Sequence, residues 1–171
     1  MSGAVVWLTG LPAAGKTTLA AALATALIQR GQTPVILDGD SLRAGPHRDL
    51  GFTAEDRAEH VRRVAVQAAQ AAEGGQIAIV AVIAPLRVMR TTARHLVAPH
   101  PFHDIHVATS LEECERRDPK GLYRRARAGL LPGFTGIDAP YEEPEHPVLR
   151  IDTAVTPVED AVAAIIRRLD V

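Results

Sequence analysis

Short apolar runs of strand length alternate along the chain with longer segments whose apolar positions have a helical spacing. The apolar runs are residues 5–8, 35–37, 77–83, 105–108 and the weaker 148–151. The helix-compatible segments are residues 16–30, 54–73, 86–97, 111–117 and 157–169. Strands that are apolar throughout and that alternate with helices predict a parallel sheet with helices on both faces. We therefore expect a three-layer α/β fold on a mostly parallel sheet of five strands.

A phosphate-binding motif joins the first apolar run to the first helical segment. Residues 10–17 read Gly-Leu-Pro-Ala-Ala-Gly-Lys-Thr, which fits the P-loop pattern of Gly, four residues, and Gly-Lys before Ser or Thr. Gly10 and Gly15 let backbone N–H groups approach a polyphosphate at the positive end of the helix dipole. Lys16 supplies a charge for the β- and γ-phosphates, and Thr17 supplies a hydroxyl for Mg²⁺. A glycine-rich turn that only caps a helix is the alternative, but the flanking strand and helix favour a nucleoside triphosphate site.

The composition is ordinary for a soluble globular protein, with 47% hydrophobic and 23% charged residues. We expect the 171 residues, 1–171, to form a single domain. The net charge of −1 argues against a general binder of nucleic acids or of anionic membranes. The single Cys114 suits a reducing compartment, and the longest apolar run, residues 77–85, is too short to span a bilayer. No basic-then-apolar signal segment opens the chain, so we expect a cytoplasmic protein.

One long segment, residues 118–147, departs from the alternation of strands and helices. It contains five prolines and four glycines, which complicate any long regular element. Long irregular segments in compact domains are usually functional. Its cations, which include Lys120 and Arg124, suit closure over phosphates. We expect a lid, and a solvated surface loop is the alternative.

Two carboxylates follow the second apolar run, in Asp38-Gly39-Asp40. Strand ends next to a phosphate loop are where an acceptor site is expected. One carboxylate can accept a proton from an attacking hydroxyl, and the other can hold Mg²⁺-bound water. The same three residues also make a good turn, so the assignment depends on the nearby phosphate loop.

Aromatic residues and histidines in the predicted loops supply further candidates. Phe52 and Phe134 each follow a glycine, and an exposed Phe of this kind can stack on a purine. His100, His103 and His106 lack the closed spacing that zinc prefers, so we do not expect a metal site there.

Over nearly its whole length, from about residue 3 to about residue 153, the chain resembles adenylylsulfate (APS) kinase. The matching segments are residues 5–11 with the phosphate loop, 37–43, 50–57 and the most specific, 117–138, which Tyr141 and Glu142 continue. The resemblance implies a P-loop nucleotide-kinase fold with a lid. It also implies transfer of the γ-phosphoryl group of ATP to the 3′-hydroxyl of APS, giving PAPS, with ATP and Mg²⁺ as cofactors. A homodimer is compatible with it.

Position by position, the resemblance implies a role for each of three groups of residues. ATP would be held by Gly10, Leu11, Pro12, Ala13, Ala14, Gly15, Lys16, Thr17, Thr18 and Arg117. Lys16 and Asp38 would be catalytic, with Asp38 as the candidate base, and Thr17 and Asp38 would face the metal. APS would be held by Asp40, Arg43, Phe52, Arg57, His60, Ile83, Ala84, Lys120, Leu122, Phe134, Gly136 and Ile137, with its adenine sandwiched between the two Phe rings.

Because the chain departs from the family pattern at several positions, the identity of the acceptor stays open. His60 stands where the family commonly has Asn, and Ala84 and Leu86 stand in place of Ser and Tyr. One alternative is a related P-loop kinase that acts on a different nucleotide or small alcohol. A nucleotide-operated switch or ATPase is another, but an Asn-Lys-x-Asp motif is absent and the Phe pair implies a second small-molecule site.

His60 is the departure with the clearest consequence. It lies three residues after Arg57 in a predicted helix, so the two side chains share a face. If Arg57 meets the anionic group of the acceptor, His60 is expected to gain a charge near its reference pKa of about 6.5. Acceptor affinity would then strengthen as the pH falls. The alternative is a surface histidine without a role.

Overall fold

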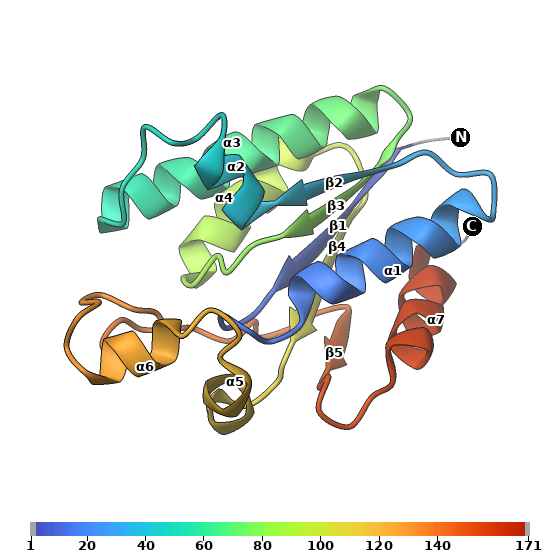
Figure 1. Ribbon diagram of the computed structural model, residues 1–171. Coiled ribbons are helices and arrows are strands. Elements are labelled where there is room, and N and C mark those ends of the chain that lie inside the picture. The colour runs from blue at the N-terminus through green and yellow to red at the C-terminus, as the bar shows by residue number, and fades with distance from the viewer. Residues whose placement is uncertain (1–2, 170–171) are drawn as a thin grey trace.

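A sheet of five parallel strands organises the computed structural model, which describes residues 3–169. The strands are β1 (Ala4–Thr9), β2 (Pro34–Asp38), β3 (Ile77–Ala81), β4 (Phe102–Val107) and β5 (Leu149–Ile151), in the spatial order β2-β3-β1-β4-β5. Because every pairing is parallel, all five strands end at the same edge of the sheet (Figure 1). The predicted α/β class is confirmed, and the sheet is parallel throughout.

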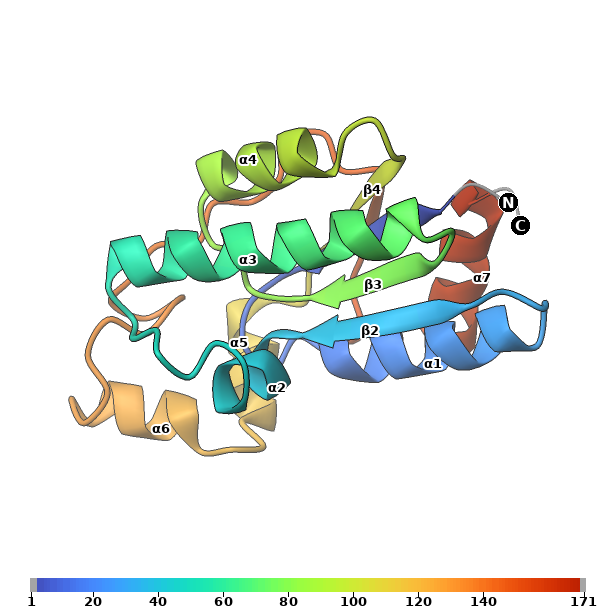
Figure 2. The same ribbon diagram turned by 90° about the horizontal axis from the view of Figure 1, so that it is seen from above.

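Long helices cover both faces of this sheet. Helices α1 (Lys16–Ile28) and α7 (Val158–Leu169) pack on one face, and α3 (Ala54–Glu73) and α4 (Arg87–Val97) pack on the other (Figures 1 and 2). The two layers arise because successive side chains of a strand point to opposite faces. In β1, Val6 and Leu8 join the core under α1, whereas Val5 and Trp7 join the core under α3.

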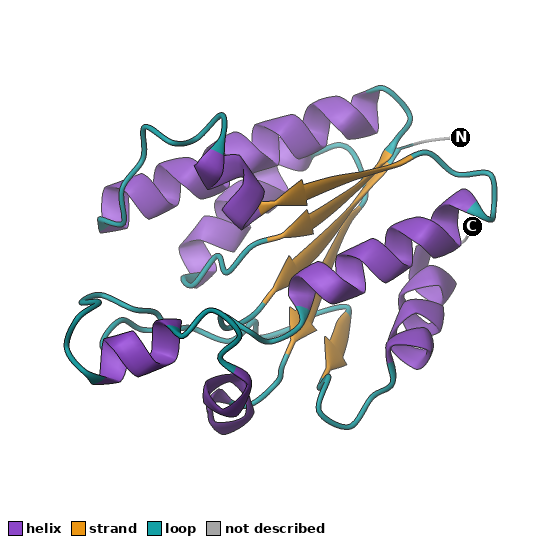
Figure 3. Ribbon diagram, in the orientation of Figure 1, coloured by secondary structure: helices purple, strands orange, loops and turns teal. Residues whose placement is uncertain are grey.

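Three short helices lie beyond the carboxyl ends of the strands: α2 (Gly39–Ala44), α5 (Leu111–Arg117) and α6 (Leu122–Arg127) (Figure 3). The sequence predicts only α5. Helix α2 forms because the Asp38 carboxylate accepts the backbone N–H of Ser41 as an N-cap. Helix α6 forms because Asp118 accepts the N–H groups of Tyr123 and Arg124, each at 3.0 Å. At six residues each, both helices are too short for a periodic pattern to show.

The predicted bounds differ from the structure mainly at β3 and β4. Strand β3 ends at Ala81, so the predicted strand positions 82 and 83 lie in the following loop. There the backbone turns away at Ala84, whose φ of 44° is in the left-handed region. Strand β4 begins at Phe102, earlier than predicted, because the Phe102 ring packs on Trp7 with 5.5 Å between ring centroids. The bounds of α3 and α5 agree with the prediction.

Within residues 3–169, none of the helices combines the length and the apolar character needed to cross a membrane.

Candidate active site at the carboxyl ends of the strands

The phosphate loop between β1 and α1 adopts a conformation that depends on its glycines. Gly15 has a φ of 103°, a region that L side chains rarely adopt. At Gly10 a Cβ would overlap the carbonyl oxygen of Val107 in β4. Ala13 also has a positive φ of 65°, so the backbone is curled around the start of α1. A curled backbone at a helix N-terminus suits a polyphosphate.

Lys16 is folded over this loop. Its Nζ donates hydrogen bonds to the carbonyl oxygens of Gly10 at 2.8 Å and Leu11 at 2.7 Å. The side chain is only 9% exposed, and this burial lowers the pKa of the ammonium group to about 8. Lys16 therefore keeps its charge near neutral pH, although the charge is only weakly solvated.

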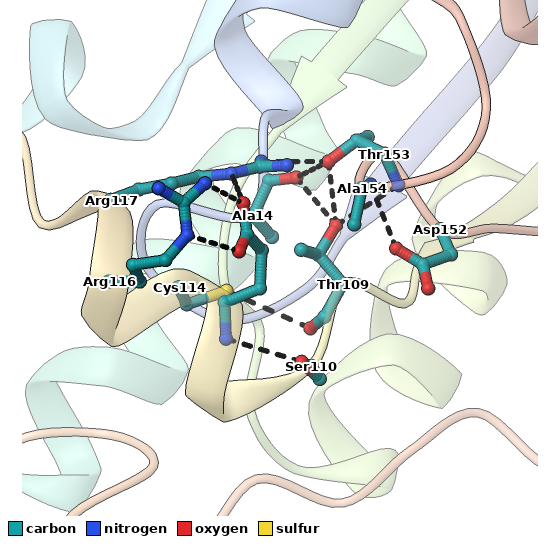
Figure 4. Close-up of polar contacts among 10 residues, drawn as sticks. Ala14, Thr109, Ser110, Cys114, Arg116, Arg117, Asp152, Thr153 and Ala154 are labelled. Atoms are coloured by element: carbon teal, nitrogen blue, oxygen red, sulfur yellow. Dashed lines mark hydrogen bonds and ion pairs between the residues drawn. The ribbon is translucent and has the colours of Figure 1, made fainter.

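The buried carbonyl of Ala14 is held by two threonines that follow β4 and β5. Thr109 Oγ1 donates to it at 2.9 Å, and Thr153 Oγ1 donates to it at 2.7 Å. Arg117, at the end of α5, donates from Nη1 to Thr153 Oγ1 at 2.8 Å, so the three side chains converge on the loop (Figure 4). Arg117 is among the residues predicted from the sequence, whereas neither threonine is. The sequence offers one indication of these threonines, because each follows closely after an apolar run that is predicted to be a strand.

The predicted lid also contacts the phosphate loop. Tyr123 of α6 donates its hydroxyl to the carbonyl of Pro12 at 2.8 Å. Gly136 lies against Leu11 and Leu111, and a Cβ there would come within 3.0 Å of the Leu11 side chain. Two parts of the segment 118–147 therefore pack directly on the loop.

Asp38 connects the phosphate loop to the end of β2. Its Oδ2 accepts a hydrogen bond from Thr17 Oγ1 at 2.8 Å, and its Oδ1 accepts from the Ser41 N–H at 3.1 Å. Burial raises the pKa of Asp38, but the hydrogen bonds from Ser41 and Thr17 together lower it by a larger amount. The pKa of Asp38 therefore lies below its usual value. Asp38 is therefore a carboxylate at neutral pH. Asp40 is exposed in α2 and forms an ion pair with Lys120 of the lid segment.

A second group of predicted residues lies on α2, on α3 and in the segment between these two helices. Arg43 Nη1 donates to the carbonyl of Gly51 at 2.8 Å, and its guanidinium carbon lies 4.6 Å from the ring centroid of Phe52. Phe52 is 70% exposed. Arg57 donates to the Gly133 carbonyl and to Thr135 Oγ1, which ties the lid segment to α3.

The remaining predicted residues flank these two groups. Phe134 meets Tyr123 edge-to-face, with 5.0 Å between ring centroids. Ile83 and Ala84 are held through their carbonyl oxygens, which accept from Thr9 Oγ1 at 2.5 Å and from Arg90 Nη1 at 2.6 Å. Thr18 is exposed in the first turn of α1, Leu122 begins α6, and Ile137 packs against the core.

The expectation for the charge of His60 is wrong. His60 is 5% exposed, and its Nδ1 lies 2.9 Å from Nδ1 of His47. Burial, assisted by the positive charge of Arg43, lowers the pKa of His60 to about 4. In the protein without a ligand the imidazole therefore stays neutral near pH 6.5, where the sequence predicts that it gains a charge. The alternative prediction of a surface position for His60 is also wrong, because the residue is buried.

The residues present fit ATP and Mg²⁺. The hydroxyl of Thr17 and the carboxylate of Asp38, 2.8 Å apart, are the oxygen ligands that Mg²⁺ prefers. The left-handed turn at Gly15 opens the helix N-terminus to phosphate oxygens, and Lys16 adds a positive charge beside it.

Comparison with known proteins places these features in a family. A family model described as Adenylylsulphate kinase matches residues 2–152. An adenylyl-sulfate kinase of Geotalea uraniireducens (strain Rf4) is 51% identical over 163 residues, which are 95% of this chain and 78% of the relative. One of Prochlorococcus marinus is 45% identical, covering 96% of this chain and 82% of the relative. The structure of the Mycobacterium tuberculosis APS kinase CysC in complex with AMPPNP and APS is similar with a TM-score of 0.96 and 40% identity, over 99% of both chains. By its sequence and its fold, this chain belongs to the adenylylsulfate kinase family.

Proposed function

We propose that this chain transfers the γ-phosphoryl group of ATP to the 3′-hydroxyl of APS, giving PAPS and ADP. The observation that carries the proposal is the contact between Thr17 and Asp38, which puts a carboxylate beside the phosphate loop. Membership of the family supports it, as does the similar M. tuberculosis enzyme, whose structure contains AMPPNP and APS.

On the donor side, the phosphate loop and Lys16 bind the triphosphate of ATP. Thr17 and Asp38 would hold Mg²⁺, which supplies positive charge against the phosphate oxygens. Lys16 now donates to the Gly10 and Leu11 carbonyls, and its ammonium group would donate to phosphate oxygens of bound ATP. Arg117 lies at the edge of this site, next to Thr153.

On the acceptor side, Asp38 is the candidate base for the attacking hydroxyl. We expect Asp38→Asn to lower kcat by about 10²–10⁴-fold with a smaller change in acceptor affinity, as is typical for loss of a general base. Steady-state kinetics with APS and ATP measure this. Asp40→Asn in α2 is the comparison variant, because Asp40 contacts Lys120 instead of Thr17 and is expected to act on acceptor binding. If Asp40→Asn lowered kcat strongly and Asp38→Asn lowered it only slightly, Asp40 and not Asp38 would be the base.

The acceptor itself would lie between α2, α3 and the lid. Asp40, Arg43 and Arg57 would surround its phosphosulfate, and the Phe52 and Phe134 rings would enclose its adenine. Lys120 and the segment 118–138 would close over it. Support comes from the exposed Phe52 ring and from the two lid contacts, Lys120 with Asp40 and Arg57 with Gly133.

A related kinase with a different acceptor is the second candidate, favoured by His60 and Ala84. The test is a coupled assay of ADP release, with APS compared against a panel of other nucleotides and small alcohols. Preference for APS supports the proposal, and a clear preference for another acceptor would replace it.

We further propose that residues 1–171 work as one catalytic domain in the cytoplasm, with 118–147 as the lid. A reducing compartment suits the buried free thiol of Cys114. A homodimer would appear as twice the chain mass in light scattering.

A further inference from the structure

Two buried histidines and a glutamine form a hydrogen-bonded row beside the acceptor side. His47 lies between α2 and α3, and His60 and Gln67 lie on α3. His47 and His60 are 2% and 5% exposed. Their Nδ1 atoms are 2.9 Å apart, and Nε2 of Gln67 lies 3.1 Å from Nε2 of His47.

The row has a direction because an amide nitrogen can only donate. Gln67 Nε2 donates to His47 Nε2, so the proton of a neutral His47 lies on Nδ1. His47 Nδ1 then donates to His60 Nδ1, which leaves the proton of a neutral His60 on Nε2.

Both rings stay neutral at physiological pH. Burial lowers the pKa of His47, and it lowers the pKa of His60 to about 4. The charged groups that act on the pair are the cations Arg43 and Arg63 and the anions Asp40, Asp49 and Glu59. Arg63 forms ion pairs with Asp49 and Glu59, so its charge is largely balanced nearby.

The second ring nitrogen of His60, Nε2, lies beside the backbone at the start of α2. A Cβ placed on Gly39 would lie 3.5 Å from His60 Nε2, so this nitrogen is next to the backbone between Asp38 and Asp40. Within residues 3–169, His60 Nε2 makes no hydrogen bond. Its proton is therefore available to a ligand.

We propose that Gln67 and His47 are positioning residues that hold His60 in its Nε2–H tautomer, so that the neutral ring donates a hydrogen bond to an oxygen of the acceptor's anionic group. This inference rests on the proposed function, because it takes the acceptor to be an anionic nucleotide. In the opposite tautomer, His60 Nε2 would present a lone pair to the same oxygen, which is repulsive. The row thus lets a histidine act as a fixed neutral donor.

The tautomers are read by NMR of the ring nitrogens in the free protein at neutral pH. We expect His60 to carry its proton on Nε2 and His47 to carry its proton on Nδ1. Gln67→Met removes the directing donor, so both His60 tautomers should appear and the ring nitrogen shifts should move toward average values. Gln70→Met on the exposed side of the same helix is the matched control and should leave the shifts unchanged. The proposal would be overturned by a His60 proton on Nδ1. It would also be overturned by ring nitrogen shifts that are the same in Gln67→Met as in the unaltered chain.

Acceptor binding gives a second readout. With AMPPNP bound, calorimetric titration with APS should show about twofold weaker binding for Gln67→Met, because about half of the molecules then hold the competent tautomer. His60→Phe, which removes the donor, should weaken binding by about tenfold or more. Gln70→Met should bind as the unaltered chain does. Equal affinity in Gln67→Met and the unaltered chain would contradict a positioning role.

The two proposals fail in distinguishable ways. If the unaltered chain shows the expected tautomers but neither binds nor phosphorylates APS, the proposed acceptor is wrong while the directed row stands. If it phosphorylates APS but His60 carries its proton on Nδ1, the positioning inference is wrong while the proposed function stands.

Discussion

The phosphate loop and the acceptor side are held in place by different kinds of contact. The loop is fixed by backbone geometry at Gly10 and Gly15 and by the Thr109 and Thr153 hydroxyls on the Ala14 carbonyl. The acceptor side is built from long side chains of separate segments. Its connections to the lid are the ion pair of Lys120 with Asp40 and the bonds of Arg57 to Gly133 and Thr135.

From this difference we propose a rigid donor site and an acceptor site that opens. Exposed ion pairs such as Lys120–Asp40 contribute about 0–1 kcal/mol. Each hydrogen bond on the Ala14 carbonyl contributes about 0.5–1.5 kcal/mol, and a broken one would leave a buried polar group without a partner. We therefore expect ATP to meet a preformed loop, and the acceptor to meet a site that the segment 118–147 would complete.

The largest effect is expected from Lys16→Ala. The lysine contact strengthens as charge moves onto the transferred phosphate, so its loss should reduce kcat by at least about 10³-fold. Steady-state kinetics measure the loss, and far-ultraviolet circular dichroism checks that the fold is kept. Near-normal turnover would mean that residues 10–17 do not form the donor site.

A smaller effect on the acceptor side is expected from Arg57→Ala. Loss of a charged donor should raise the Michaelis constant for APS by about 10- to 100-fold and change the constant for ATP little. Arg62→Ala on the same helix is the control, because Arg62 forms its ion pair with Glu59 at the surface.

Arg57→Ala also tests the lid directly. In the unaltered chain, hydrogen exchange in residues 118–138 should slow when both nucleotides bind, and the variant should reduce that protection. Equal exchange with and without nucleotides would indicate a static loop and remove the contrast between the two sites.

Thr153→Val tests the rigidity of the donor side. It removes the hydroxyl that connects Arg117 to the Ala14 carbonyl, so ATP binding should weaken by about three- to tenfold while APS binding is unchanged. Thr153→Ser keeps the hydroxyl and should restore the affinity, which a loss caused by side-chain packing alone would not do. Calorimetry with AMPPNP measures both variants.

The smallest effect is a pH dependence of ATP binding. The pKa of Lys16, about 8, lies below its usual 10.5, so the charge is present below pH 8 and is lost as the pH rises through that value. Only the ammonium form attracts phosphates, so ATP affinity should fall about fourfold from about pH 7 to about pH 8.5. Calorimetry with AMPPNP should also detect proton uptake on binding near pH 8. An affinity that stays constant over this range would mean that Lys16 is not the titrating group.

The sequence by itself determined the layout of the fold and the donor site. Apolar strands, helical periodicity and the glycine and lysine spacing of residues 10–17 are local patterns, so they can be read along the chain. They predict the parallel sheet, the long helices and the placement of Asp38 and Asp40 at a strand end near the phosphate loop. The resemblance to the family added the roles on the acceptor side, which the local patterns alone do not specify.

Only the tertiary structure decided which distant side chains meet. Thr109 and Thr153 are separated by 44 residues, and they converge on Ala14 because β4 and β5 end side by side. The charge of His60 depends on burial and on His47, neither of which a residue type or helical position reveals. The short helix α6 depends on two capping hydrogen bonds to Asp118, and such bonds carry no periodic signal. Where contacts are local, the sequence predicts them, and where they depend on the packing of separate segments, only the fold does.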